Sequence, residues 1–169
     1  MKAHGIDIDK KSCLFAKSLG LNIFNGKIEN ANYPNNYFDI IQLKQVLEHI
    51  YQPKKLLAEI RRILNKNGIL IIDVPNQKGL IPKIKILLNY PNNEYGFLQP
   101  LRHLYAYTAK SLKYLLEKNN FKIINYFTSY PGNSTYCPLY KQKLLQKILF
   151  KITNIFKKGS ILVVYTKKS

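Results

Sequence analysis

Apolar and polar residues follow one another in blocks that predict short strands alternating with helices. Residues 4–9 predict a short buried strand that ends in two acids, and residues 10–19 predict a helix that Gly20 ends. Residues 21–24 predict a second strand, and the Asn-, Gly- and Pro-rich residues 25–37 predict a loop. The large apolar residues expected on one side of the helix are Leu14, Phe15 and Leu19.

The middle of the chain has the clearest pattern. Residues 38–43 form an apolar run that is typical of a strand covered on both faces, and residues 69–74 predict another such strand. Between them, Pro53 suits the first turn of a helix, and Asn67–Gly68 is expected to end that helix. Its apolar residues recur at spacings of three and four, at Leu56, Leu57, Ile60, Ile63 and Leu64. This alternation of strands and helices predicts a parallel α/β sheet.

The rest of the chain predicts one long connection, two helices and two strands. Residues 77–107 are irregular and rich in proline and aromatic residues, which indicates a lid-like insertion. Thr108 is expected to cap a helix that runs through Asn119, and residues 121–128 and 161–166 predict strands. At this length the chain is expected to form a single domain over residues 1–169.

Basic residues outnumber acidic ones, most of all in the second half. The net charge is +18, and residues 96–169 hold 13 basic side chains and one acid, Glu117. A field of one sign attracts anionic partners, although a solvated basic surface is the simpler explanation. Residues 139–158 predict a basic amphipathic helix that suits either an anionic membrane surface or a cover for the sheet. With few arginines and no RNA-binding signature, no specific nucleic-acid partner is expected.

The cysteines and the N-terminus indicate a compartment. Cys13 and Cys137 lack metal-ligand spacing, so we expect reduced thiols and no metal. No apolar run reaches the ~18 residues that span a bilayer, and the opening MKAHGIDIDKK lacks the apolar core of a signal peptide. These features predict a cytoplasmic protein, with peripheral contact with the inner face of the membrane as an additional hypothesis.

A series of segments in fixed order carries a family resemblance. They are GIDID, GKIENANYPNNYFDII, QVLEHI, PKKLLAEIRRILNKNGILIIDVPN and RHLYAYTAKSLKYLLEKNNFKII. Together they resemble the class I S-adenosylmethionine-dependent methyltransferases of the small-molecule type. The resemblance implies a Rossmann-like α/β sheet, mostly parallel with an antiparallel last strand, and S-adenosyl-L-methionine as cofactor.

The resemblance also implies cofactor contacts at three places. Asp7, followed by Ile8, would end a strand and accept hydrogen bonds from both ribose hydroxyls, a task that suits an acceptor-only carboxylate. The alternative is a solvated acid at a strand end, and Asp9 is interpreted as a helix N-cap.

Lys27 and Ile28 occupy the adenine position. Lysine has no acceptor for the adenine amine, so Lys27 departs from the family pattern and leaves the Ile28 backbone for that contact. Leu43 and Lys44 would lie near the methionine part.

Two histidines are the catalytic candidates. By resemblance, His49 flanks the cofactor and faces the acceptor, and the alternative is a local hydrogen-bonding role beside Glu48. His103 precedes Tyr105 and Tyr107, where an imidazole of near-neutral pKa could remove a proton from an acceptor hydroxyl. The alternative there is an aromatic loop that packs on itself.

One expected piece of the family pattern is absent from this sequence. Its eight glycines include no Gly-x-Gly spacing, and the first strand–helix unit of the family, on the order of 30 residues, has no counterpart before His4. We therefore expect a truncated domain in which the strands at 5–8 and 38–43 pair abnormally or stand apart.

The resemblance implies methyl transfer to a small acceptor. Whether the expected truncated domain is active is left open. The basic half favours an anionic acceptor such as a phosphorylated lipid or a glycan precursor. The alternative is a non-catalytic remnant that binds a partner or a membrane through its basic C-terminal face.

Overall fold

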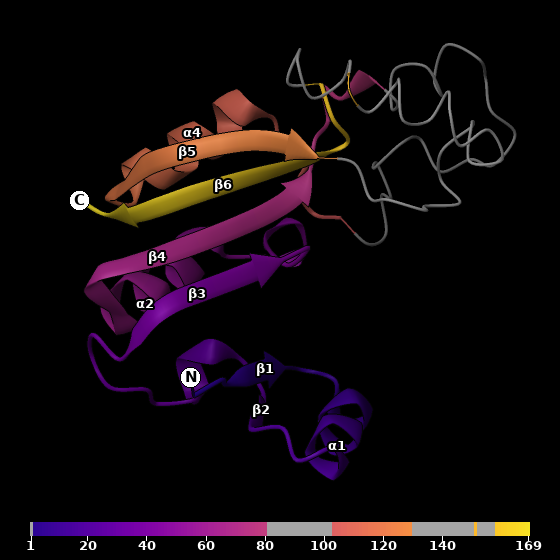
Figure 1. The fold of residues 1–169 in the computed structure, drawn as a ribbon, viewed down its shortest axis with the longest axis vertical. Helices are drawn as coiled ribbons and strands as arrows, with labels where there is room; N and C mark the ends of the chain where they lie inside the picture. The colour runs from indigo at the N-terminus through magenta and orange to yellow at the C-terminus, as the bar shows by residue number, and fades with distance from the viewer. Residues whose placement is uncertain (1, 81–102, 130–150, 152–157) are drawn as a thin grey trace, which may run out of the picture.

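The computed structural model describes residues 2–80, 103–129, 151 and 158–169, and their strands form two sheets (Figure 1). The first sheet is two-stranded and pairs β1 with β2 in parallel. The second is four-stranded, in the order β3-β4-β6-β5. The bounds of the strands are β1 Gly5–Asp7, β2 Ile23–Asn25, β3 Phe38–Lys44, β4 Leu64–Pro75, β5 Phe121–Ser129 and β6 Ile161–Lys168.

The first sheet is held by the helix α1 (Lys10–Ser18), which connects its two strands. Asp9 caps that helix as predicted, because its Oδ2 accepts a hydrogen bond from Ser12 N at 2.7 Å. Gly20, with a φ of +77°, follows the helix in the left-handed conformation that favours glycine. Cys13 is a free, buried thiol, and its Sγ donates to Asp7 O at 3.4 Å. α1 is therefore tied to the end of β1.

Two expectations about burial in this region are wrong. β1 is half-buried to exposed rather than buried, and the predicted apolar side of α1 is open. The exposed side chains on that helix and just after it are Leu14, Phe15, Leu19 and Leu21. The physical reason is that no element among the described residues covers this side of the helix.

The strands β1 and β3 stand apart among the described residues, as expected, because they belong to different sheets. β3 is an edge strand that pairs in parallel with β4, and it was wrongly expected to be covered on both faces. Leu43 is buried, whereas Ile40 is 58% exposed. The reason is that one face of this sheet is less covered among the described residues, because Ile40 pairs with the half-buried Ile69 whereas Leu43 pairs with the buried Ile72.

The helix α2 (Pro53–Ile63) packs the sheet from one side, and the side chains of Leu57, Ile60 and Ile63 are fully buried. The helix ends at Ile63, four residues before the predicted stop, because Leu64 already has the extended backbone of β4. Asn67–Gly68 therefore lies within a strand. Glycine is needed there because an added Cβ would lie 2.8 Å from Leu64 Cδ1.

The C-terminal half completes the sheet. β6 lies between β4 and β5 and is antiparallel to both, which confirms the antiparallel last strand. The helix α4 (Ala109–Lys118) begins with a capping box between Thr108 and Ser111, as the expected Thr108 cap requires. One core cluster joins both helices to the sheet, with Leu47, Leu57, Ile60, Leu70, Ile72, Leu112, Leu116, Phe121, Leu162 and Val164 among its members.

Several expectations fall partly or wholly outside the described residues. These are most of the insertion at 77–107, most of the basic helix at 139–158, and Cys137. Within the part of the chain that is described, no helix is long and apolar enough to cross a membrane.

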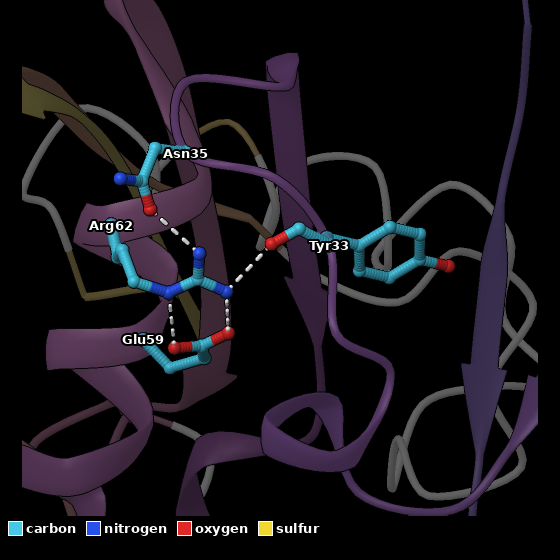
Figure 2. Close-up of polar contacts among 4 residues, drawn as sticks. All are labelled: Tyr33, Asn35, Glu59 and Arg62. Atoms are coloured by element: carbon cyan, nitrogen blue, oxygen red, sulfur yellow. Dashed lines mark hydrogen bonds and ion pairs between the residues drawn. The ribbon is translucent and has the colours of Figure 1, made fainter.

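Arg62, near the end of α2, connects the main sheet to the loop that leads back to the first sheet (Figure 2). Its guanidinium donates to both carboxylate oxygens of Glu59, at 2.9 and 2.6 Å. It also donates to Asn35 Oδ1 and to Tyr33 O, each at 2.7 Å. The ring of Tyr33 lies 5.7 Å from that of His4, which precedes β1. One cation thus satisfies acceptors on both the helix and the loop.

We predict that Arg62→Ala lowers the free energy of unfolding, because the hydrogen bonds that this cation donates to Glu59, Asn35 and Tyr33 are all lost, although the site is exposed. Urea unfolding measures this change. Arg61→Ala is the matched control, since it removes an equal charge from the preceding position of the same helix, and it should cost less than about 0.5 kcal/mol. Equal losses in the two variants would contradict the assigned role of Arg62.

The ion pair between Arg62 and Glu59 predicts that the free energy of unfolding depends on pH. The hydrogen bonds from Arg62 lower the pKa of the Glu59 carboxyl below its ordinary value of 4.5. A lowered pKa in the folded state adds stability above the unfolded value, and that stability is lost as the pH falls through the folded value. The stability difference between the unmodified chain and Arg62→Ala should therefore shrink when unfolding is repeated below pH 4.5. A difference that stays constant to low pH would show that the ion pair contributes nothing.

Candidate functional site

The carboxyl ends of the parallel strands bring the predicted site residues to one side of the molecule. β1 pairs in parallel with β2, and β3 with β4, and Figure 1 shows β1 and β3 pointing the same way. Ligands of open α/β sheets bind at this edge. Two groups of predicted residues lie there, one at the end of β1 and one just after β3.

Asp7 is the last residue of β1, and its carboxylate is exposed. The backbone around it is fixed, because Gly26 N donates to Asp7 O at 2.8 Å and Asn25 Nδ2 donates to both Asp7 O and Ile8 O at 3.1 Å. Asp7 Oδ1 accepts from Asp9 N at 2.8 Å. The rest of this carboxylate faces solvent on a rigid strand end, which fits an acceptor for ligand hydroxyl groups. Beside it, the Ile8 side chain is 76% exposed.

The expected adenine position lies at the start of a short 3-10 helix, η1 (Ile28–Asn30). Lys27 precedes that helix with an exposed side chain, which makes no capping hydrogen bond. The Ile28 side chain is partly buried and packs against the core. Ile28 is thereby held in place, and its backbone is what could meet a ligand.

The end of β3 is locked to β4 by Asp73. Gln45 has a φ of +53°, a conformation that is strained for a residue other than glycine. It is held by hydrogen bonds from its N–H to Asp73 Oδ1 at 2.8 Å and to Asp73 O at 3.0 Å. Of the predicted pair just before it, Leu43 is buried in the core and Lys44 is exposed. This turn sets the direction of the next element, η2 (Leu47–His49).

η2 presents Glu48 and His49 to a segment distant in sequence that contains His103. Leu104 N and Tyr105 N donate to Glu48 O at 2.8 and 3.2 Å, which fixes that segment against η2. The rings of His49 and His103 lie 4.9 Å apart between centroids, and His49 Nε2 is 3.9 Å from Glu48 Oε1. We call Glu48, His49 and His103 the EHH cluster.

The EHH cluster contains a carboxylate in an unusual environment. Glu48 is 1% exposed, and among the described residues no other residue donates a hydrogen bond to its carboxylate oxygens. Burial raises the pKa of the Glu48 carboxyl, while the nearby His49 and His103 oppose that rise. Burial also raises the pKa of the Tyr107 hydroxyl, with smaller contributions from Tyr105 and from Glu48. Side chains able to bind or exchange protons thus converge at the end of β3.

The structure joins some of the predicted residues and separates others. It brings His49 and His103 together, although the sequence indicated them as separate candidates. It adds Glu48, whose neighbour His49 was selected while Glu48 was not. The sequence shows Glu48 as a charged residue directly after the apolar Leu47. Its burial depends on the tertiary structure, so the local pattern does not show it.

The comparisons with known proteins show which family this chain belongs to. A family described as "Methyltransferase domain" matches residues 2–126. An uncharacterized protein of Methanocaldococcus jannaschii is 29% identical over 80 residues, which cover 47% of this chain and 39% of that protein. A ubiquinone/menaquinone biosynthesis C-methyltransferase of Francisella tularensis subsp. novicida is 34% identical over 87 residues, which cover 50% of this chain and 33% of the relative. The matches thus span well under half of both curated relatives.

Comparison with solved structures shows which fold the chain has. A SAM-dependent methyltransferase from Archaeoglobus fulgidus superposes with a TM-score of 0.64 at 18% identity, covering 98% of this chain and 75% of that one. This likeness shows the Rossmann-like α/β fold of the methyltransferases. Since the family model matches residues 2–126, which is most of the chain, this chain belongs to the methyltransferase domain family.

Proposed function

We propose that this protein binds S-adenosylmethionine at the end of β1 and transfers its methyl group to a small acceptor bound near the EHH cluster. The observation that carries the proposal is the exposed carboxylate of Asp7, held at the end of β1 on the same side of the molecule as the end of β3, which the EHH cluster follows (Figure 1). Membership of the methyltransferase domain family supports methyl transfer as the class of reaction.

The cofactor contacts divide between side chains and backbone. Asp7 accepts hydrogen bonds from the two ribose hydroxyls, and the exposed Ile8 supplies an apolar surface beside them. The Ile28 backbone meets the adenine edge, because Lys27 carries donors alone and cannot accept from the adenine amine. Lys44, and the backbone of the buried Leu43, lie on the methionine side.

Methyl transfer requires little acid–base chemistry beyond loss of the acceptor proton. The cofactor supplies a methyl group on a positively charged sulfur. A new bond forms between the acceptor atom and the methyl carbon, the carbon–sulfur bond breaks, and its electron pair stays on sulfur as S-adenosylhomocysteine. In-line positioning of the two reactants gives most of the rate. His49 and His103 contact the acceptor and promote loss of its proton to solvent.

The charge of the chain favours an anionic acceptor. A net charge of +18 attracts small anions before they bind, and phosphorylated lipids and glycan precursors are acceptors of this kind. The name of the Francisella relative adds carbon atoms of quinone precursors to the acceptor chemistries to be tested.

The cofactor assignment predicts the effect of Asp7→Ala on binding of S-adenosylhomocysteine. Two charge-assisted hydrogen bonds of ~1.5–3 kcal/mol each are lost, so affinity should fall at least tenfold. Asp9→Ala is the matched control, because it removes an equal charge two residues away and weakens the cap of α1. Titration calorimetry on both variants compares them. Unchanged binding in Asp7→Ala would refute the site, and no binding by the unmodified chain at millimolar ligand would favour the non-catalytic alternative.

The acceptor assignment predicts that His49→Ala and His103→Ala lower methyl transfer by about 10²-fold, the usual contribution of a positioned proton-transfer group. Both variants should bind S-adenosylhomocysteine with affinity unchanged within about threefold, since they do not touch the ribose site. Mass spectrometry of a panel of phenols, amines and phosphorylated hydroxy compounds detects the methylated product. His4→Ala, which removes an imidazole packed on aromatic rings outside the cluster, should keep its rate. A full rate in either cluster variant would remove that histidine from the mechanism.

A further inference from the structure

The EHH cluster has the composition of a metal site. Its three side chains each offer one ligand atom, and these atoms lie within 4.8 Å of one another. Two imidazoles with one carboxylate form a donor set that suits Zn²⁺ and related first-row divalent cations and leaves positions open for another ligand. No local spacing indicates this set of ligands, because His103 is 54 residues from His49.

The geometry is close to what a cation requires. Bonds of ~2.0–2.2 Å place two ligand atoms at most about 4.4 Å apart across one cation. His49 Nε2 and Glu48 Oε1 already meet that limit at 3.9 Å. All three ligand atoms lie within 4.8 Å of one another, so a small side-chain rotation would suffice to bring every pair within that limit. The backbone bonds from Leu104 N and Tyr105 N to Glu48 O hold the two segments in this relation.

Burial of Glu48 is the independent observation that points to a cation. Its side chain is 1% exposed, and among the residues described here no other residue donates a hydrogen bond to its carboxylate oxygens, while His49 Nε2 lies 3.9 Å from Oε1. A buried carboxylate without compensating hydrogen bonds destabilises a protein unless a positive charge or a metal ion offsets the lost hydration. A divalent cation held by Glu48 and both histidines would provide that charge.

We propose that Glu48, His49 and His103 bind one divalent cation of the Zn²⁺ class. This inference deepens the proposed function, on which its catalytic meaning rests. A cation here would coordinate an acceptor oxygen and make its hydroxyl more acidic, which is how the two histidines would promote loss of the proton. The competing explanation is a cluster held by hydrogen bonds and ring contacts alone, with Glu48 neutral.

The experiment titrates the tag-free full chain, after dialysis against a chelator, with Co²⁺, whose visible absorption reports its ligands, and then displaces Co²⁺ with Zn²⁺. We expect one cation per chain. Glu48→Gln and His103→Ala should each weaken Co²⁺ binding at least 100-fold, because each removes one of three protein ligands. His4→Ala, which leaves the cluster intact, should bind as the unmodified chain does.

A fold control accompanies the titration. Glu48→Gln keeps the shape of the side chain and removes its charge, so the metal-free variant should have a melting temperature equal to or above that of the unmodified chain. Added Zn²⁺ should raise the melting temperature of the unmodified chain and leave that of Glu48→Gln unchanged. His103→Asn is the second variant, and it must lose Co²⁺ binding as well.

Two outcomes would overturn the proposal: no saturable Co²⁺ binding by the unmodified chain, or equal affinity in the folded Glu48→Gln and His103→Asn variants. Both are distinct from failure of the proposed function. Loss of S-adenosylhomocysteine binding would refute the methyltransferase assignment while leaving the cation titration as it stands.

Discussion

The pairing of β4 on both sides is the interaction on which the rest of the structure depends. β4 is parallel to β3 and antiparallel to β6, so it joins the N-terminal and C-terminal halves of the main sheet. Its residues Leu70, Ile72 and Val74 are fully buried and pack in the same cluster as residues of α2 and α4. Burial of apolar surface on this strand is the main source of stability, because each such side chain contributes about 1.5–3 kcal/mol. At its carboxyl end, Asp73 then fixes the turn that carries the EHH cluster.

A second constraint is the joining of two sheets that share no hydrogen-bonded strands among the described residues. The loop at 33–37 connects them, and it is bound to α2 through Arg62 and through backbone bonds from Asn36 N to Arg62 O and from Tyr37 N to Ile63 O. The Asp7 strand end is therefore positioned by polar contacts and aromatic packing rather than by continuous strand pairing. Such contacts are weaker than a strand ladder, which makes this connection sensitive to pH and to single substitutions.

The chemistry of the candidate site follows from a conflict between stability and function. Glu48 is buried where an apolar side chain would be more stable, and Gln45 adopts a left-handed backbone that β-strand residues avoid. Both features lie next to the end of β3, where the strand leads into η2. Strain and buried charge that persist in a folded protein are commonly found at functional sites, where they hold reactive groups in place. The same site therefore accounts for the proposed acceptor chemistry and for the proposed cation.

Local sequence patterns determined much of this protein. The apolar spacing of Leu57 and Ile60 specified α2, and Asp9 and Thr108 specified helix starts. The order of segments predicted that β1 and β3 pair abnormally or stand apart, and among the described residues they stand apart. These features depend on neighbours in sequence, which is why reasoning from the chain could find them. The exposure of β3, the early end of α2 and the union of Glu48 and His49 with His103 were decided by the tertiary structure. Each of them depends on which distant element lies alongside, and a one-dimensional pattern carries no information about that.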